Sequence, residues 1–103
     1  MILYTLTTIE CRKRRGSMNK RTPGIYTELS LAQEAVEGNF GDIHECSFDY
    51  AVIETTETDC LYPFIKKGYR QWWYRWRGDN ETGKYVRCRK PRTFVRVIGF
   101  GIG

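Results

Sequence analysis

The sequence predicts a small α+β domain in which an antiparallel β-sheet carries one helix, with the elements in the order ββαβββ. Three observations support this class. The chain has 103 residues, which is enough for one domain. Segments rich in β-branched and aromatic residues, which favour strands, recur along most of it. Only one segment has the apolar spacing of an amphipathic helix. We therefore expect one domain over residues 1–103, with about five strands in its sheet.

Two strands are expected before the helix. Residues 2–10 are rich in Ile, Leu, Thr and Tyr, a composition typical of a strand. A short second strand is expected at residues 21–26, where Pro23-Gly24 indicates a sheet edge or a bulge. The basic segment between them, from Cys11 to Lys20, is expected to form the loop of a hairpin.

The helix is expected at residues 29–38. Ser30 and Gln33 have the spacing of a capping box at its start. The turn-forming sequence from Gly38 to Gly41 indicates where it stops. The apolar stripe that would face the sheet consists of Leu29, Ala32 and Val36.

The strands after the helix are marked by apolar and aromatic runs. Residues 45–54 end in the run Tyr50-Ala51-Val52-Ile53, which is typical of a central strand. Between this strand and the next we expect a polar turn at residues 55–59 and a packed loop at residues 61–64. The aromatic segment 69–77 and the segment 84–90 are expected to pair through a hairpin loop at 78–83, with a further strand at 94–98.

Charge is segregated along the chain, which carries a net charge of +5. Residues 1–21 hold six Lys and Arg and one acid, residues 22–65 hold nine acids and no Lys or Arg, and residues 66–103 hold eleven Lys and Arg and two acids. Solubility alone requires only mixed charges. We therefore expect a dipolar fold whose basic side attracts phosphate-bearing partners.

Membrane and secretory signals are not expected from the sequence. It has no apolar run of about 18 residues, the minimum for a membrane span. The first residues lack a basic region followed by an apolar stretch, which a secretory signal would require. These features predict a cytoplasmic protein that does not bind membranes.

The cysteines and the histidine do not form a recognisable metal or catalytic pattern. The four cysteines, at positions 11, 46, 60 and 88, include no Cys-x-x-Cys pair, so we expect free thiols and no metal. His44 lies two residues from Cys46, but no third group is indicated for catalysis. Walker, dinucleotide-binding and HExxH motifs are missing. Carboxylate pairs leave a hydrolytic site open, but we expect a non-enzymatic binding protein without a cofactor.

The candidate phosphate-binding residues are basic and come from two parts of the chain. Four successive bases in the expected hairpin loop and four arginines on the aromatic strands would together form one surface for phosphates. Trp73 and Tyr85 are candidates for stacking on bases, as in single-strand binders. The structural alternative is that the aromatic residues pack as core against the helix. The basic candidates are Arg12, Lys13, Arg14, Arg15, Arg75, Arg77, Arg87 and Arg89.

Strand alternation divides the aromatic strand between two faces of the sheet. It places Trp73 with Arg75 and Arg77 on one face, and the other aromatic residues of the strand on the opposite face. On the returning strand, Tyr85, Arg87 and Arg89 share one face.

A second candidate surface is acidic and comes from the middle of the chain. Its carboxylates could imitate a nucleic-acid backbone and occupy a basic groove on a protein partner. The structural alternative is a solvated helix face, since acids are favoured in the first turn of a helix. The acidic candidates are Glu34, Glu37, Asp42 and Glu45.

Several short motifs resemble those of a known group of proteins. They are Arg21-Thr22-Pro23-Gly24-Ile25-Tyr26-Thr27, Ala35-Val36-Glu37, Gly41-Asp42-Ile43-His44-Glu45, Tyr50-Ala51-Val52-Ile53-Glu54, Leu61-Tyr62-Pro63, Trp73-Tyr74-Arg75-Trp76, Lys90-Pro91 and Gly99-Phe100-Gly101-Ile102-Gly103. These motifs are similar to those of a family of small uncharacterised proteins of bacteria, phages and mobile elements, and they span nearly the whole chain. The resemblance implies a cytoplasmic single domain of mobile-element origin, and it attaches no chemistry to the motifs.

Two functions are consistent with these patterns. The first is a counter-defence inhibitor of the anti-CRISPR type, because small phage proteins often inhibit host defences. It would bind a bacterial immune effector protein or ribonucleoprotein, or its nucleic acid, through the dipolar surface. The second is a binding module for a nucleotide or single-stranded nucleic acid, such as a sponge for a signalling nucleotide. Either would be a monomer or a homodimer paired through an edge strand.

Overall fold

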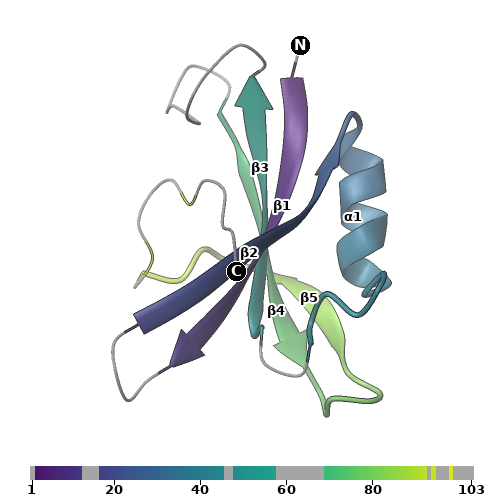
Figure 1. The fold of residues 1–103 in the computed structure, drawn as a ribbon, viewed down its shortest axis with the longest axis vertical. Coiled ribbons are helices and arrows are strands. Elements are labelled where there is room, and N and C mark those ends of the chain that lie inside the picture. The colour runs from purple at the N-terminus through teal and green to yellow at the C-terminus, as the bar shows by residue number, and fades with distance from the viewer. Residues whose placement is uncertain are drawn as a thin grey trace.

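The computed structural model describes residues 2–12, 17–45, 48–57, 69–92, 94 and 98, and of residues 11, 12, 17, 18 and 57 it describes only the backbone. In this part of the chain, five strands form one antiparallel sheet in the order β2-β1-β3-β4-β5 (Figure 1). The predicted class and the order ββαβββ are confirmed. The elements are β1 (Ile2–Arg12), β2 (Ser17–Tyr26), α1 (Leu29–Glu37), β3 (Tyr50–Glu57), β4 (Gln71–Arg77) and β5 (Lys84–Cys88).

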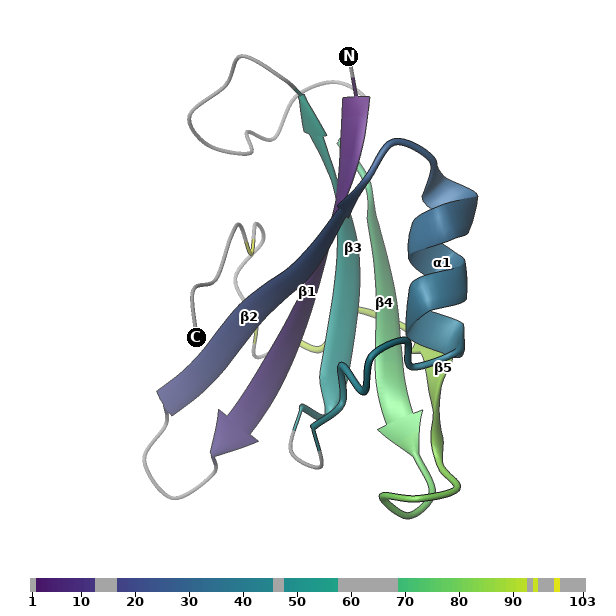
Figure 2. The same cartoon turned by 45° about the vertical axis from the view of Figure 1, so that its right-hand side comes forward.

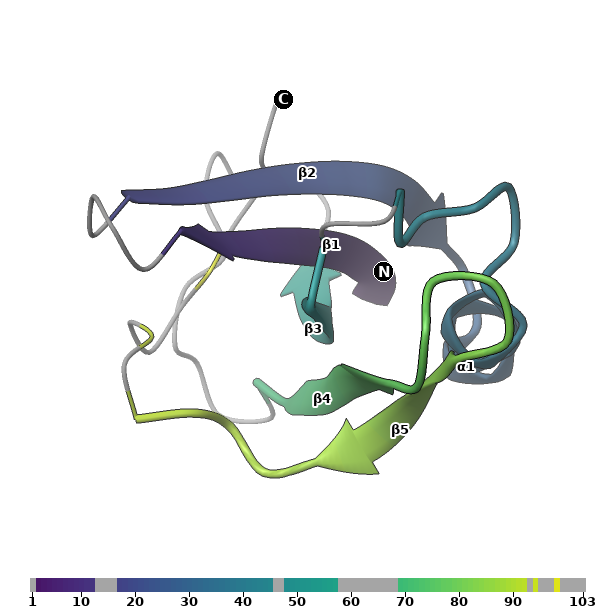
Figure 3. The ribbon, with the colours of Figure 1, turned by 90° about the horizontal axis from the view of Figure 1, so that it is seen from below.

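The sheet has a packed core on each of its two faces. On one face α1 covers the strands, as the two side views show (Figures 1 and 2). In the view along the strands, α1 lies on one side of the sheet and the described segment that follows β5 extends to the other (Figure 3). The helix-side core consists of Leu6, Ala32, Ala35, Val36, Ala51, Ile53, Tyr74 and Tyr85. The opposite-face core consists of Ile9, Val52, Trp73, Phe94 and Ile98.

The helix begins and ends close to its predicted bounds, but the predicted capping box is wrong. The residue that caps its start is Glu28, which makes no capping hydrogen bond through its side chain. Ser30 therefore already lies inside the first turn and does not have the extended backbone of a capping residue. The predicted stop is confirmed, because the Gly38 N–H donates to the Glu34 carbonyl at 2.9 Å. Most of the helix stability comes from its apolar stripe against the sheet.

The third strand starts later than the sequence predicts. The predicted start at Glu45 is wrong, because the chain still turns there. Asn39, Asp42 and Glu45 have φ of 48°, 54° and 45°, a conformation outside the strand region. The predicted polar turn at 55–59 is also wrong in its first part, since β3 continues to Glu57. Thr56 fits in the strand because the Thr5 hydroxyl lies 3.3 Å from its own.

The two hairpins differ in how well they were predicted. The first is longer than expected, because β1 and β2 pair as far as Arg12 and Ser17. The remaining four residues of the expected basic loop, 13–16, lie outside the described ranges. The predicted edge and bulge at Pro23-Gly24 are confirmed, since β2 is an edge strand and its register shifts between the partners of Leu6 and Thr8. The second hairpin joins β4 and β5 as predicted, although β5 ends at Cys88.

The expected strand at 94–98 is not seen in the described residues. Phe94 and Ile98 pack on the opposite-face core outside any strand, and residues 93 and 95–97 lie outside the described ranges. The expected packed loop at 61–64 also lies outside them. Within the part of the chain that the structure describes, no helix has the length and apolarity to cross a membrane.

Candidate phosphate-binding site

A pocket of about 490 Å³ opens where β4 begins and β5 ends, and we call it the β4–β5 pocket. Cross-strand pairing puts Trp73 opposite Cys88, and alternation places both side chains on the sheet face away from α1. The pocket is lined by Tyr69, Gln71, Trp73, Arg87, Cys88, Arg89 and Lys90. It therefore combines aromatic, amide and thiol groups with three cationic side chains.

A hydrogen-bonded network centred on Glu54 forms the wall behind the pocket. Glu54 is fully buried in β3, and its Oε2 accepts hydrogen bonds from Tyr69 Oη, from Gln71 Nε2 at 3.3 Å and from the Ile98 N–H at 2.9 Å. Trp73 Nε1 donates to Gln71 Oε1 at 3.1 Å. Burial and the hydrogen bond to Glu54 hold the pKa of Tyr69 well above its usual value, so its hydroxyl keeps its proton.

The cationic lining comes from Arg87 in β5 and from Arg89 and Lys90, which directly follow the strand. Lys90 Nζ donates to the Phe94 carbonyl at 2.7 Å. The Arg87 guanidinium lies 5.5 Å from the centre of the Tyr74 ring, in cation–π range. Between the cations, burial raises the pKa of the Cys88 thiol, against the effect of nearby arginines. Cys88 is a free thiol in its protonated form, which is a poor nucleophile.

The structure does not bring the four predicted arginines onto one face. Arg75 and Arg77 are exposed on the face away from α1, where Arg75 lies 5.8 Å from the Tyr50 ring centre. Arg87 instead pairs with Tyr74, whose side chain belongs to the helix-side core. The expectation that these arginines form a single surface is therefore wrong. Paired residues on neighbouring strands point to the same face, and Arg87 pairs with Tyr74 rather than with Arg75 or Arg77. Arg89 is exposed at the pocket.

The predicted stacking residues are core residues. Trp73 and Tyr85 are each only 2% exposed. The Trp73 ring stacks on Phe94 at 5.1 Å, and the Tyr85 hydroxyl donates to the Phe48 carbonyl at 2.6 Å. Because neither ring offers a face to solvent, the prediction that they stack on bases is wrong. Of the predicted basic loop, Lys13, Arg14 and Arg15 lie outside the described residues, and only the backbone of Arg12 is described.

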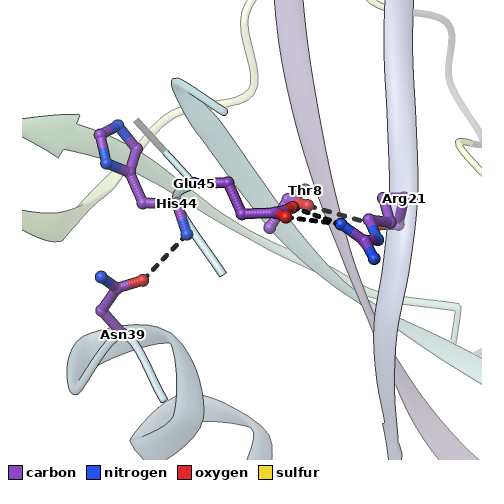
Figure 4. Close-up of polar contacts among 5 residues, drawn as sticks. All are labelled: Thr8, Arg21, Asn39, His44 and Glu45. Carbon is purple, nitrogen blue, oxygen red and sulfur yellow. Dashed lines mark hydrogen bonds and ion pairs between the residues drawn. The ribbon is translucent and has the colours of Figure 1, made fainter. Parts of the chain in front are cut away.

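The acidic candidates do not all remain available to a partner. Glu34 and Glu37 are exposed on α1, and Asp42 is exposed in the turn after it. Glu45 instead forms an ion pair with Arg21 of β2, whose Nη1 lies 2.6 Å from both carboxylate oxygens (Figure 4). The prediction that Glu45 belongs to a free acidic surface is therefore wrong. Both side chains of the pair are more than 40% exposed, so it contributes about 0–1 kcal/mol.

His44 is a core residue next to this ion pair. It is 2% exposed, and its ring stacks on Trp76 with centroids 3.7 Å apart. Its backbone N–H donates to Asn39 Oδ1 at 2.9 Å (Figure 4), while Nδ1 makes no hydrogen bond. Burial lowers the pKa of His44, although Asp42 and Asp49 act in the opposite direction. Among the residues that the structure describes, no three His, Cys, Asp or Glu side chains converge as a metal site.

Four lining residues and their buried partner were not among the residues predicted from the sequence. Lys90 could have been found, because it continues the basic run that starts at Arg87. Glu54 carries a weaker signal, since its position in β3 shares a face with Val52 and is therefore buried. Tyr69 and Gln71 carry no local signal, because their role depends on where Glu54 lies in space.

Comparisons of the chain with protein-family models, with curated proteins and with solved structures gave no match. The resemblance to small mobile-element proteins therefore stays a prediction. Function has to be argued from the site itself.

Proposed function

We propose that the protein is a non-enzymatic binding protein for a phosphate-bearing ligand, either a nucleotide or a single-stranded nucleic acid, and that the β4–β5 pocket is its binding site. One observation carries this proposal. Three cationic side chains, Arg87, Arg89 and Lys90, line the pocket, and none of its described lining residues is acidic. Arginine and lysine are the side chains that hold phosphate oxygens through charge-assisted hydrogen bonds.

The charges around the pocket support the same ligand class. Arg75 and Arg77 add exposed positive charge on the face away from α1. The exposed carboxylates of Glu34 and Glu37 lie on α1, which covers the other face. A field of this form attracts anions to the pocket side of the sheet and speeds their association at low salt.

The chemistry of the pocket favours binding over catalysis. The raised pKa of Cys88 keeps its thiol protonated, and Tyr69 retains its proton through Glu54. Neither group is activated as a nucleophile or a base near neutral pH. The cations would hold the ligand, while the neutral wall of Tyr69, Gln71 and Trp73 would shape the pocket around it.

Titration with candidate ligands tests the proposal. Trp73 lines the pocket, so its fluorescence reports on occupancy. Purified, nuclease-treated protein would be titrated with short single-stranded RNA and with mononucleotides and cyclic dinucleotides at two salt concentrations. We expect a saturable change that weakens as salt rises, because phosphate contacts release counterions. The absence of binding to every one of these ligands at low salt would refute the proposal.

A second candidate function is inhibition of a bacterial immune effector through the acidic helix. One observation favours it: exposed carboxylates at Glu34 and Glu37 occur with exposed apolar side chains, since Leu31 is 44% and Phe40 is 58% exposed. Mixed surfaces of this kind suit protein partners, and the acids would suit a basic nucleic-acid groove. In a counter-defence assay, Glu34→Lys with Glu37→Lys should abolish inhibition, while Arg89→Gln should leave it intact. Unchanged inhibition in the acidic double variant would remove this candidate.

A further inference from the structure

We infer that the β4–β5 pocket recognises a polyphosphate group, meaning two or more linked phosphates, and that it does not discriminate between bases. This inference rests on the proposed function and narrows its ligand class. It follows from three properties of the described residues: the size of the pocket, the spacing of its cations and the engagement of its other polar groups.

The size of the pocket fits a compact ligand. Its volume of about 490 Å³ is within the roughly 300–1,000 Å³ typical of small-molecule sites. Arg87, Arg89 and Lys90 belong to four successive residues, whose backbone spans at most about 14 Å even when fully extended. Three positive charges concentrated over this length match a group that carries several negative charges close together. An extended nucleic acid would distribute its charges over a much longer path.

The groups that could read a base are already engaged. Trp73 is buried and stacked on Phe94 with an interplanar angle of 19°, so it has no free face for a base. The amide of Gln71 bonds to Trp73 on its oxygen side and to Glu54 and Tyr69 on its nitrogen side. Base discrimination requires donors and acceptors aimed at base edges, whereas phosphate contacts carry no sequence information. Lys90 also donates to the Phe94 carbonyl and Arg87 lies against Tyr74, but a lysine carries three N–H donors and an arginine five, so the cations keep donors for a ligand.

The acidic group behind the wall is held inside the protein by hydrogen bonds. Glu54 is fully buried and accepts three hydrogen bonds, one of them from the Ile98 backbone. It is not one of the residues that line the pocket. Among the described lining residues a polyphosphate would therefore meet cationic and neutral side chains, and its affinity should increase with the number of phosphates.

Calorimetry with a phosphate series tests the inference on the intact chain. We expect adenosine triphosphate to bind at least about tenfold more tightly than the monophosphate, because each added charge-assisted contact is worth about a factor of ten. Cytidine triphosphate should bind within about threefold of adenosine triphosphate. Inorganic tripolyphosphate shows whether the phosphate chain alone or also the nucleoside provides the affinity. Equal affinity would show that the phosphate chain alone is recognised, and weaker binding that the nucleoside adds contacts. Equal binding of mono- and triphosphate would overturn the inference.

A pair of double variants separates this inference from general phosphate binding. Arg89→Gln with Lys90→Gln should weaken triphosphate binding by about tenfold or more. Arg75→Gln with Arg77→Gln is the matched control, since it removes two charges outside the pocket lining that act only through their long-range field. At physiological salt, where this field is screened, it should change affinity less than about threefold. Urea denaturation would verify that both variants fold, because Lys90 also binds the Phe94 carbonyl.

The outcomes of this comparison are distinct. An equal loss in both double variants would overturn the inference and indicate a surface that tracks a polymer. Binding of single-stranded RNA without binding of triphosphates would do the same, while the proposed function would stand. If neither ligand binds, both the inference and the proposed function fail.

Discussion

Replacing Glu54 by glutamine tests whether the network behind the pocket stabilises the fold. In the native chain Glu54 is fully buried, and its Oε2 is the common acceptor for Tyr69 Oη, Gln71 Nε2 and the Ile98 N–H. Glutamine has nearly the same size, but its amide offers one neutral oxygen and adds an NH₂ donor group beside the donors of Tyr69, Gln71 and Ile98. Glu54→Gln therefore changes the hydrogen bonding while preserving the packing.

The expected loss follows from the contacts of Glu54. A hydrogen bond to a charged group contributes about 1.5–3 kcal/mol, and one between neutral groups about 0.5–1.5 kcal/mol. Weakening three bonds by about 1 kcal/mol each reduces the free energy of unfolding by about 3 kcal/mol. This is a large part of the roughly 5–15 kcal/mol that stabilises a domain. In a domain of about this size it corresponds to a fall in Tm of about 12–24 °C.

Urea denaturation followed by tryptophan fluorescence measures this loss. The matched control is Glu34→Gln, the same change on the exposed surface of α1, where we expect an effect within about 0.5 kcal/mol. The dependence of the free energy on urea should be the same in all three proteins, so that a shift in midpoint reports stability. Equal stability of the Glu54 and Glu34 variants would refute the claim that the network stabilises the fold.

Two further predictions concern His44 and the β4–β5 hairpin. Burial lowers the pKa of His44 below 6.5, so as pH falls the unfolded chain binds a proton before the folded chain does. The free energy of unfolding should therefore decrease below pH 6.5, by at most about 1.4 kcal/mol per pH unit. In urea titrations His44→Phe should reduce this slope, and an unchanged slope would contradict the assignment. Gly78→Ala should destabilise by about 1–3 kcal/mol in the same assay, because φ is +101° and a Cβ would lie 2.8 Å from the Gly83 Cα. Gly41→Ala, with open space around it, should cost less, and equal losses would contradict the steric argument.

Strand alternation in β4 could be predicted because it is a local property. Side chains in a strand point to alternate faces, so the sequence alone divides Trp73 from Tyr74. The structure confirms this division, with Tyr74 in the helix-side core and Trp73 in the opposite-face core. That both faces are buried could not be predicted, because Phe94 covers Trp73 from a distant part of the chain. The same missing information led to the incorrect stacking role for Trp73.

The burial of Glu54 could not be predicted from the sequence for a related reason. Glu34 and Glu54 are the same residue type within one acidic segment, yet one is exposed and the other is fully buried. The difference is set by donors that lie 15 residues away at Tyr69 and 44 residues away at Ile98. Counting charges along the chain cannot separate an acid that interacts with solvent from one that organises the core. One of the acids of this segment, Glu54, is therefore internal structure, although it was not among the residues of the predicted acidic surface.

The same alternation decides which cations remain available for a ligand. Arg21 and Lys20 are neighbours in the basic N-terminal block, but they point to opposite faces of β2. Arg21 shares the helix side with the acidic turn and is paired with Glu45. Lys20 lies on the other face and donates to the Ile98 carbonyl at 2.5 Å.

The carboxylates of α1 and the exposed arginines of β4 lie on opposite sides of the sheet, and salt screens exposed charges over a Debye length of about 8 Å at physiological ionic strength. Arg21 on the helix side is paired with Glu45, whereas Arg75 and Arg77 on the opposite face are exposed. Segregation along the sequence thus becomes a separation in space, with exposed carboxylates on α1 and the exposed arginines of β4 on the opposite face of the sheet.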